Sequence, residues 1–206
     1  MIDHLVYGTP DLLATVEELA DRFGFALSEG GRHLGFGTRN HLADLGERRY
    51  LEVVGPDWEQ PDHDGPRLFG VETLDRPRLL TWAARVDDLD RVAREAADGG
   101  HEVGEIRSMS RDSADGAPIT WRMTPPLAVP ECHGLVPFLV QWTGSAHPAD
   151  RAARGARLVA LRGSTPDVGG VRGRLAALGE DLPLTAGDRW GLEAVLETPR
   201  GRVVLD

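Results

Sequence analysis

A pattern that occurs three times constrains this chain more than any other feature of its sequence. Each copy has a short apolar stretch, a helix-start signal, a helix with one apolar face, and a glycine at its end. The copies lie at residues 2–24, 80–100 and 158–179. Because repetition at this scale identifies a scaffold, we expect it to define the fold more firmly than the activity.

Short signals in each copy predict where the helices begin and end. The motif Thr-Pro-Asp at residues 9–11 and 165–167 predicts two helix starts, with the threonine hydroxyl as N-cap, the proline in the first turn and the acid at the positive end of the dipole. Apolar residues at i, i+3 and i+4 follow each start, which gives each helix one buried face. Gly24, Gly99-Gly100 and Gly179 predict the C-terminal stops.

Strand-like segments follow each helix and complete a βαβββ module. They are short runs of mixed polarity separated by turn residues, as in antiparallel strands with one buried face. The predicted strands after the three helices are 25–29, 40–45 and 50–54; 101–106, 119–123 and 136–142; and 181–185, 192–198 and 202–205.

The repeat predicts an α+β fold in which βαβββ modules form a cupped mixed sheet. Modules at residues 1–55 and 79–143 would make a first domain at residues 1–150. A third, truncated module at residues 156–206 would pack on it. Linkers rich in proline and aspartate join the three modules.

Composition and charge exclude several classes of partner. The 206 residues are 41% hydrophobic and 27% charged, which is ordinary for a globular protein. A net charge of −10 and the lack of any basic run argue against nucleic acid or an anionic membrane as partner. No apolar run approaches the roughly 20 residues that cross a bilayer. With a single cysteine, Cys132, and no signal peptide, we expect a cytoplasmic protein without an internal disulfide.

Several separated motifs resemble one superfamily. The opening strand Asp-His-Leu-Val at residues 3–6 and the strand Tyr-Leu-Glu-Val-Val-Gly at residues 50–55 resemble the glyoxalase/vicinal-oxygen-chelate superfamily. Residues 30–40, 50–56 and 137–142 are similar to its glyoxalase-like domain group. The resemblance covers residues 1–150 and implies the cupped fold. This scaffold hosts isomerases, lyases, dioxygenases, epimerases and metal-free binding proteins.

The resemblance also implies where a metal would bind. Superfamily ligands lie on the first and last strands of each module, which here gives His4 and Glu52 in the first module. In the second module, alignment on Asp88 puts Thr81 at the position of His4 and Gln141 at that of Glu52. His4, Glu52 and Gln141 are therefore the candidate ligands for Zn²⁺, Fe²⁺, Mn²⁺ or Ni²⁺. Threonine in place of a second histidine argues against a dioxygenase.

Three readings of the His4 and Glu52 pair remain open, and in the simplest His4 is a polar residue that lines the cup and is hydrogen-bonded to Glu52. With a metal, the pair would leave coordination positions for two oxygens of a substrate. Without one, a partly buried carboxylate beside an imidazole can still move a proton. His33 or His133 could reach the site from a loop.

Other residues are candidates for binding the substrate. Arg39, Asn40 and Arg122 could hold a carboxylate or an enediolate oxygen. Trp121 could form an aromatic wall. Strand alternation puts Gln141 and Trp142 on opposite faces, and we assign Trp142 to the core.

The sequence thus predicts a cup that binds a small oxygen-rich or amphipathic molecule. If the protein is an enzyme, we expect a lyase or isomerase that acts through an enediolate. The alternatives are a protein that binds or sequesters its ligand without chemistry, and a ligand sensor. We expect a monomer or a homodimer, because this scaffold closes its cup within one chain or between two.

Overall fold

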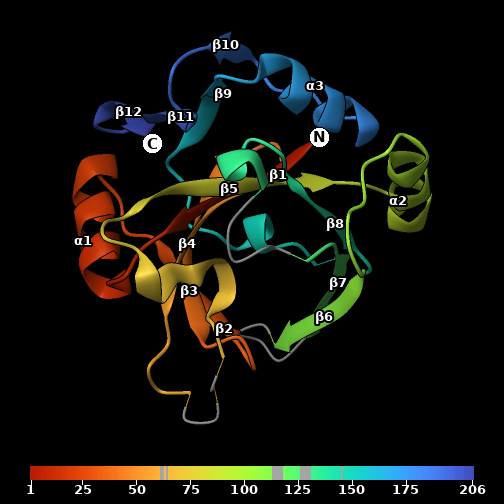
Figure 1. Ribbon diagram of the computed structural model, residues 1–206. Helices are drawn as coiled ribbons and strands as arrows, with labels where there is room; N and C mark the ends of the chain where they lie inside the picture. The colour runs from red at the N-terminus through yellow and green to blue at the C-terminus, as the bar shows by residue number, and fades with distance from the viewer. Residues whose placement is uncertain (61–62, 64, 113–117, 126–130, 145) are drawn as a thin grey trace.

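The described part of the chain contains two β-sheets, three α-helices and three short 3-10 helices (Figure 1). The computed structural model describes residues 1–60, 63, 65–112, 118–125, 131–144 and 146–206. The larger sheet has eight strands in the order β2-β3-β4-β1-β5-β8-β7-β6. Its strands are β1 (Ile2–Gly8), β2 (Ser28–His33), β3 (Thr38–Gly46), β4 (Arg49–Pro56), β5 (Arg78–Arg85), β6 (Arg107–Asp112), β7 (Pro118–Met123) and β8 (Phe138–Trp142).

Each half of this sheet is one βαβββ module. The first strand of each module pairs in parallel with the last, β1 with β4 and β5 with β8, and the other pairs within a module are antiparallel. The two modules join through the antiparallel pair of β1 and β5 at the centre. The α+β fold with a cupped mixed sheet, predicted from the repeat, is confirmed.

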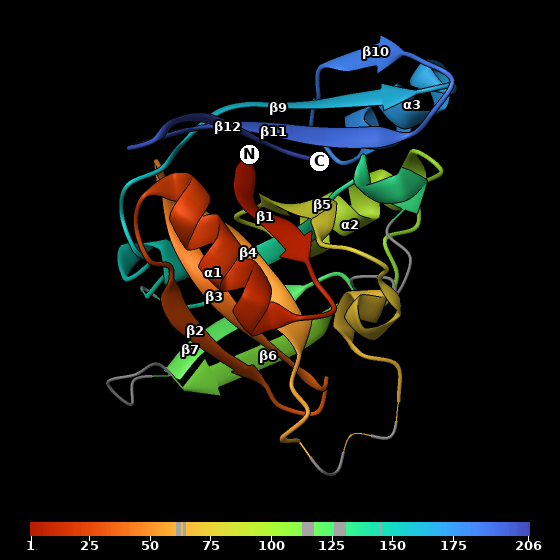
Figure 2. The same ribbon diagram turned by 90° about the vertical axis from the view of Figure 1, so that its left-hand side faces the viewer.

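The eight-stranded sheet curls until its two ends meet. Strands β2 and β6 stand at opposite ends of the strand order, yet they contact each other. The curl gives the sheet a concave face, which encloses the site described below. The convex face is covered by α1 (Leu12–Phe23) on one side and by the smaller sheet on another (Figure 2).

The helices begin two residues later than the threonine of each Thr-Pro-Asp motif suggests. Asp11 is the N-cap of α1, and its carboxylate accepts from the backbone N–H of Ala14. Thr9 stands outside the helix and its hydroxyl accepts from the N–H of Asp11. The same shift occurs at α3 (Val168–Ala177), which Asp167 caps. The prediction of a threonine N-cap was wrong, because a carboxylate one position before the helix reaches its free amides directly.

The second module also departs from its predicted strands. Its helix α2 (Leu89–Asp98) ends before Gly99 and Gly100, as predicted. Residues 101–106, predicted as a strand, form no regular structure, and the first strand after α2 is β6 at Arg107–Asp112. The polar sequence of β6 hid it, because only one of its faces meets apolar neighbours.

The last fifty residues form the smaller sheet. It consists of β9 (Arg157–Thr165), β10 (Leu184–Ala186), β11 (Gly191–Thr198) and β12 (Gly201–Leu205) in the order β10-β9-β11-β12. The order of elements along the chain is again βαβββ. The pairing differs, because β9 lies between β10 and β11 and does not pair with the last strand. This unit is therefore similar to the other two in sequence order but has its own topology.

One apolar core joins the two sheets. It contains Leu5 and Trp82 from the large sheet and Leu161 and Leu196 from the small one, all at most 5% exposed. Within the described part of the chain, no helix is long and apolar enough to cross a bilayer.

Candidate ligand-binding site

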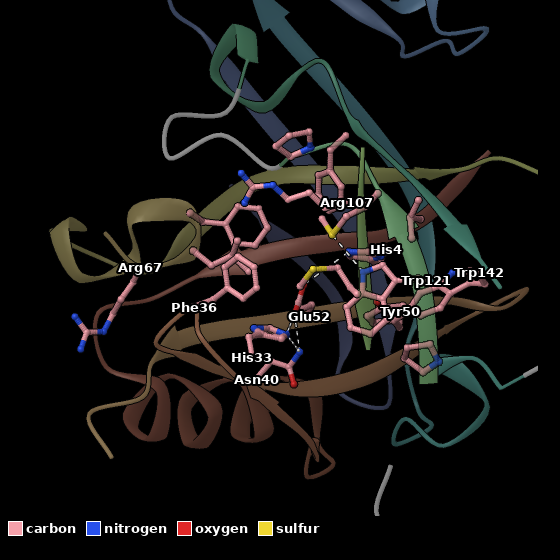
Figure 3. A pocket seen from close by; sticks show the side chains of 18 of the residues that line it. His4, His33, Phe36, Asn40, Tyr50, Glu52, Arg67, Arg107, Trp121 and Trp142 are labelled. Atoms are coloured by element: carbon pink, nitrogen blue, oxygen red, sulfur yellow. Dashed lines mark hydrogen bonds and ion pairs between the residues drawn. The ribbon is translucent and has the colours of Figure 1, made fainter. Parts of the chain in front are cut away.

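The concave face of the large sheet encloses a pocket of about 200 Å³ (Figure 3). Strands from both modules line it, together with the segment after β4. The lining residues are His4, His33, Phe36, Asn40, Tyr50, Glu52, Pro66, Arg67, Leu68, Phe69, Arg107, Met109, Trp121, Met123, Pro125, Phe138, Val140, Trp142 and Pro148.

Glu52 is the centre of the polar wall, which the first module supplies. Its side chain is buried, and one carboxylate oxygen, Oε1, accepts from the Nδ2 of Asn40 at 2.5 Å. His33 Nε2 lies 3.4 Å from the same oxygen, and His4 Nε2 lies 3.7 Å from Oε2. Three side chains, from β1, β2 and β3, thus converge on one carboxylate of β4.

Strand pairing explains this convergence. β4 lies between β1 and β3, so a residue on its concave face has neighbours on both sides. Glu52 is opposite Val6 on β1 and opposite Leu42 on β3. Residues two positions away, His4 and Asn40, point to the same face because side chains alternate along a strand. The first module therefore brings its polar residues together through register alone.

Asp3, which sequence reasoning missed, holds His4 in place. It is fully buried beneath the pocket, and its Oδ1 lies 2.8 Å from His4 Nδ1. Its Oδ2 accepts from Trp142 Nε1 at 3.0 Å and lies 3.1 Å from His147 Nε2. Burial alone would raise the pKa of Asp3, but the hydrogen bonds from His147 and His4 hold it well below its ordinary value. Asp3 is therefore an ionised carboxylate that only accepts hydrogen bonds.

The ionised Asp3 decides the tautomer of His4. Because a carboxylate cannot donate, the facing Nδ1 of His4 must carry a hydrogen. In the neutral ring the Nε2 lone pair then points into the pocket toward Glu52. The ring is also stacked on Tyr50, with centroids 4.5 Å apart. The imidazole of His4 is thus held in one orientation, with a hydrogen on Nδ1.

The second module supplies an apolar wall. Trp121 and Trp142 lie in contact, with ring centroids 5.6 Å apart, and Phe138 contacts both Phe69 and His4. Met109, Met123 and Val140 complete this side. The pocket therefore has one polar wall and one wall of flat and flexible apolar side chains (Figure 3).

The structure brings together most of the predicted site residues. His4, His33, Asn40, Glu52 and Trp121 all line the same pocket. Trp142, assigned to the core from sequence, lines it as well. It does so because its ring lies at the concave face while its N–H reaches the buried Asp3.

Three predicted residues, and the loop candidate His133, are not among the lining residues. Gln141 points to the opposite face of β8, where its Nε2 donates to the carbonyl of Asp87 at 2.6 Å. Arg122 makes two hydrogen bonds to Asp90, at 2.7 and 2.8 Å. Arg39 pairs with Glu29 at 2.6 Å. His133 stacks on Trp190, with centroids 4.9 Å apart.

Strand register shows that Phe138, not Gln141, stands in the second module where Glu52 stands in the first. Glu52 pairs with the residue two positions after His4. In the second module the residue two positions after Thr81 is Ala83, and Ala83 pairs with Phe138. The sequence alignment was wrong by three residues, because nothing in the sequence fixes where β8 begins to pair with β5.

Comparisons with known proteins agree with the fold. The model of the glyoxalase-like domain family matches residues 2–179. A solved structure of a hypothetical protein from Staphylococcus aureus is 14% identical and has a TM-score of 0.65, and the match covers 98% of this chain and 83% of that one. Comparison with curated proteins gives no match.

Methylmalonyl-CoA epimerases also match, with lower structural similarity. The Mycobacterium tuberculosis epimerase is 18% identical with a TM-score of 0.43, and the match covers 68% of this chain and 85% of that one. A Streptomyces coelicolor epimerase in complex with 2-nitronate-propionyl-CoA is 22% identical with a TM-score of 0.46, over 69% and 97%. The chain belongs to the glyoxalase-like domain family, within the vicinal-oxygen-chelate superfamily.

Superfamily members often use a divalent metal, so the residues here must be tested for one. Among the described residues, no group of three or more His, Cys, Asp or Glu side chains is arranged to hold a metal ion. His4 and Glu52 offer two donors, and the ring nitrogens of His33, the third such residue near this carboxylate, lie within hydrogen-bond distance of Thr38 and Asn40. Gln141 points away, and Phe138 stands where the second module would supply a further ligand. The described residues therefore do not fit a protein-held metal site.

Proposed function

We propose that the pocket binds a small amphipathic molecule with a carbonyl group, and that Glu52 and His4 move the proton on the adjacent carbon. The product of this step is an enolate or enediolate, as in a lyase or isomerase. The observation that supports the proposal most strongly is a buried carboxylate at the pocket wall, facing an imidazole whose tautomer Asp3 fixes.

Each polar residue has a role in this step. Glu52 takes the proton from carbon, and the hydrogen bond from Asn40 keeps its carboxylate turned into the pocket. His4, when protonated on Nε2, donates to the oxygen that gains negative charge. The Asp3 carboxylate stabilises this imidazolium across the ring. Return of the proton from Glu52 to the neighbouring carbon, while the other hydroxyl of the enediol gives its proton back to His4, completes an isomerisation.

Proton exchange with solvent tests the proposal without knowledge of the natural substrate. 2-Hydroxyacetophenone has a flat ring and an acidic C–H between a carbonyl and a hydroxyl group. In D₂O, we expect the wild-type protein to replace its CH₂ protons with deuterium, seen as loss of the ¹H NMR signal. Glu52→Gln should lower the rate about 100-fold or more while 2-hydroxyacetophenone still binds.

Glu197→Gln is the matched control for this experiment. Glu197 pairs with Arg157 on the smaller sheet, so the substitution makes the same chemical change outside the pocket. It should leave the rate unchanged. Exchange by Glu52→Gln at the wild-type rate would contradict the role of Glu52.

A non-catalytic binding protein is the second candidate. The observation that favours it is the apolar second module, with Phe138 in the register position of Glu52. In that case 2-hydroxyacetophenone would bind with no exchange above the rate in buffer, for wild type and Glu52→Gln alike. The same NMR experiment therefore separates the two candidates.

A further inference from the structure

We infer that the ligand of this pocket is an anion with a flat apolar body, whose acidic group lies at the pocket rim beside Arg107. The inference rests on the proposed function for the polar end of the ligand, which faces Glu52 and His4. The rim of the pocket indicates the acidic group of the ligand, and the apolar wall indicates its flat body.

The apolar wall selects a flat body of limited size. Trp121 and Trp142 offer ring surfaces on one side, and Phe69 and Phe138 offer rings on another. Aromatic side chains in such positions favour a planar partner by stacking and edge contacts. The volume of about 200 Å³ is somewhat larger than a cavity of about 150 Å³ that takes up benzene. One ring with a substituent at each end fits this space.

The charges that line the pocket select an acidic group. Although the chain has a net charge of −10, the described residues that line the pocket include two arginines and a single carboxylate, that of Glu52. Arg67 is already engaged, because its Nε donates to the carbonyl of Gly37 and its guanidinium lies 4.1 Å from the ring centroid of Trp58. In Figure 3 its head points away from Glu52.

Arg107 is the cation that remains available to a ligand. It lines the pocket from β6 and is exposed, and its guanidinium has no hydrogen bond or ion pair within the described part of the chain. Figure 3 shows it at the upper edge of the pocket, with Glu52, His33 and Asn40 below. Strand alternation puts Met109 on the same face of β6 as Arg107. A ligand whose acidic group lies beside Arg107 can therefore place its apolar body against Met109.

This arrangement also keeps the negative charge of the ligand apart from the negative charge of Glu52. An acidic group at the rim meets the guanidinium fork of Arg107, where a bidentate contact can form. A carbonyl at the other end of the ring meets Glu52 and His4. An acid bound the other way round would face the Glu52 carboxylate without a cation beside it, which is unfavourable. The charges therefore specify the direction of the ligand as well as its class.

Two matched probes test the inference. 4-(Hydroxyacetyl)benzoate has a carbonyl and hydroxyl group at one end of a ring and a carboxylate at the other. In 4-(hydroxyacetyl)benzamide an uncharged amide of similar size stands in place of the carboxylate. Binding of each is measured by calorimetry at low salt. We expect the acid to bind wild type about five- to tenfold more tightly than the amide. Arg107→Gln should reduce that preference to less than twofold and leave amide affinity within twofold.

The control variant is Arg202→Gln, on the exposed face of β12. It removes the same charge from the same protein far from the pocket lining, so it corrects for net charge. It should keep the preference for the acid. Equal affinity of wild type for acid and amide, or a preference that survives Arg107→Gln, would overturn the inference.

The outcome is independent of catalysis. Binding of the acid through Arg107 without deuterium exchange would keep this inference and contradict the proposed proton transfer. Deuterium exchange that depends on Glu52, together with equal affinity for the acid and the amide, would support the proposed proton transfer and contradict this inference.

Discussion

Asp3 is the residue on which the polar wall of the pocket depends, although it does not touch the pocket itself. Its carboxylate is fully buried and faces three hydrogen-bond donors, on His4, His147 and Trp142, and the Arg85 guanidinium lies 3.8 Å from its Oδ2. His147 takes part because the backbone N–H of Ala149 donates to its Nδ1, which leaves its Nε2 hydrogen for Asp3. One buried charge thus positions two residues of the pocket lining, His4 and Trp142.

Asp3→Asn should make the stability of the protein less dependent on acid pH. Because the pKa of Asp3 is depressed in the folded state, its contribution is fully present above the unfolded value of about 3.9 and is lost as pH falls through that value toward the folded pKa. Near pH 7 the variant should be less stable than wild type by about 3 kcal/mol. The NH₂ group of the new asparagine would face a hydrogen-bond donor where the carboxylate of Asp3 accepted a hydrogen bond.

Urea denaturation of both proteins between pH 7 and pH 2 checks this expectation. The stability difference should shrink as the pH falls below about 4. Curves that stay parallel over the whole range would show that Asp3 does not titrate as the structure requires.

At the residue level, the sequence predicted the site only in part. His4, His33, Asn40 and Glu52 could be found because they lie on or beside motifs that resemble the superfamily. Asp3 precedes His4 in the same motif, but the sequence predicted no role for it. A carboxylate in the apolar first strand was the available signal, because a buried charge needs partners.

At the level of elements, pairing register decides which side chains face each other. The sequence predicted the three α-helices and most strands, since both depend on local periodicity. It could not predict that Ala83 pairs with Phe138, because register depends on contacts between distant strands. The error moved Gln141 into the site and left Phe138 and Trp142 out of it.

Gly134 fixes the segment that leads into β8. It has a φ of +88°, and a Cβ at this position would lie 1.9 Å from the carbonyl oxygen of Leu80 on β5. Its own carbonyl accepts from the hydroxyl of Thr81 at 3.4 Å, so Thr81 holds the backbone at Gly134 against β5. Close approach of these two backbones places the start of β8 against β5.

Gly134→Ala should therefore destabilise the protein more than its backbone conformation alone explains. Gly100 is the matched control, because its φ is +83° and nothing lies within 4 Å of the Cβ position. We expect Gly100→Ala to cost about 1 kcal/mol and Gly134→Ala about 3 kcal/mol or more, measured by urea denaturation. Equal losses would show that the contact with Leu80 does not restrain this segment.

At the level of the whole molecule, the three copies have taken different roles. The first provides the polar wall and the second the apolar wall of one pocket. The third forms a separate sheet whose core side packs on the convex face, where Leu161 and Leu196 join the core of the large sheet. Sequence order predicted three modules, but the pairing of β9 with β11 could not be read from it, because the same order of elements allows more than one sheet.

The five tryptophans allow the most direct test that ligands bind between these two walls. Trp121 and Trp142 line the pocket, Trp82 is buried in the core on the other face of the sheet, and Trp58 and Trp190 lie outside the pocket lining. The measurement is a ¹H–¹⁵N NMR titration of the indole N–H signals with 2-hydroxyacetophenone. The signals of Trp121 and Trp142 should shift together while those of Trp82 and Trp190 stay in place. Shifts at Trp58 or Trp190 with none at Trp121 and Trp142 would contradict the site described here.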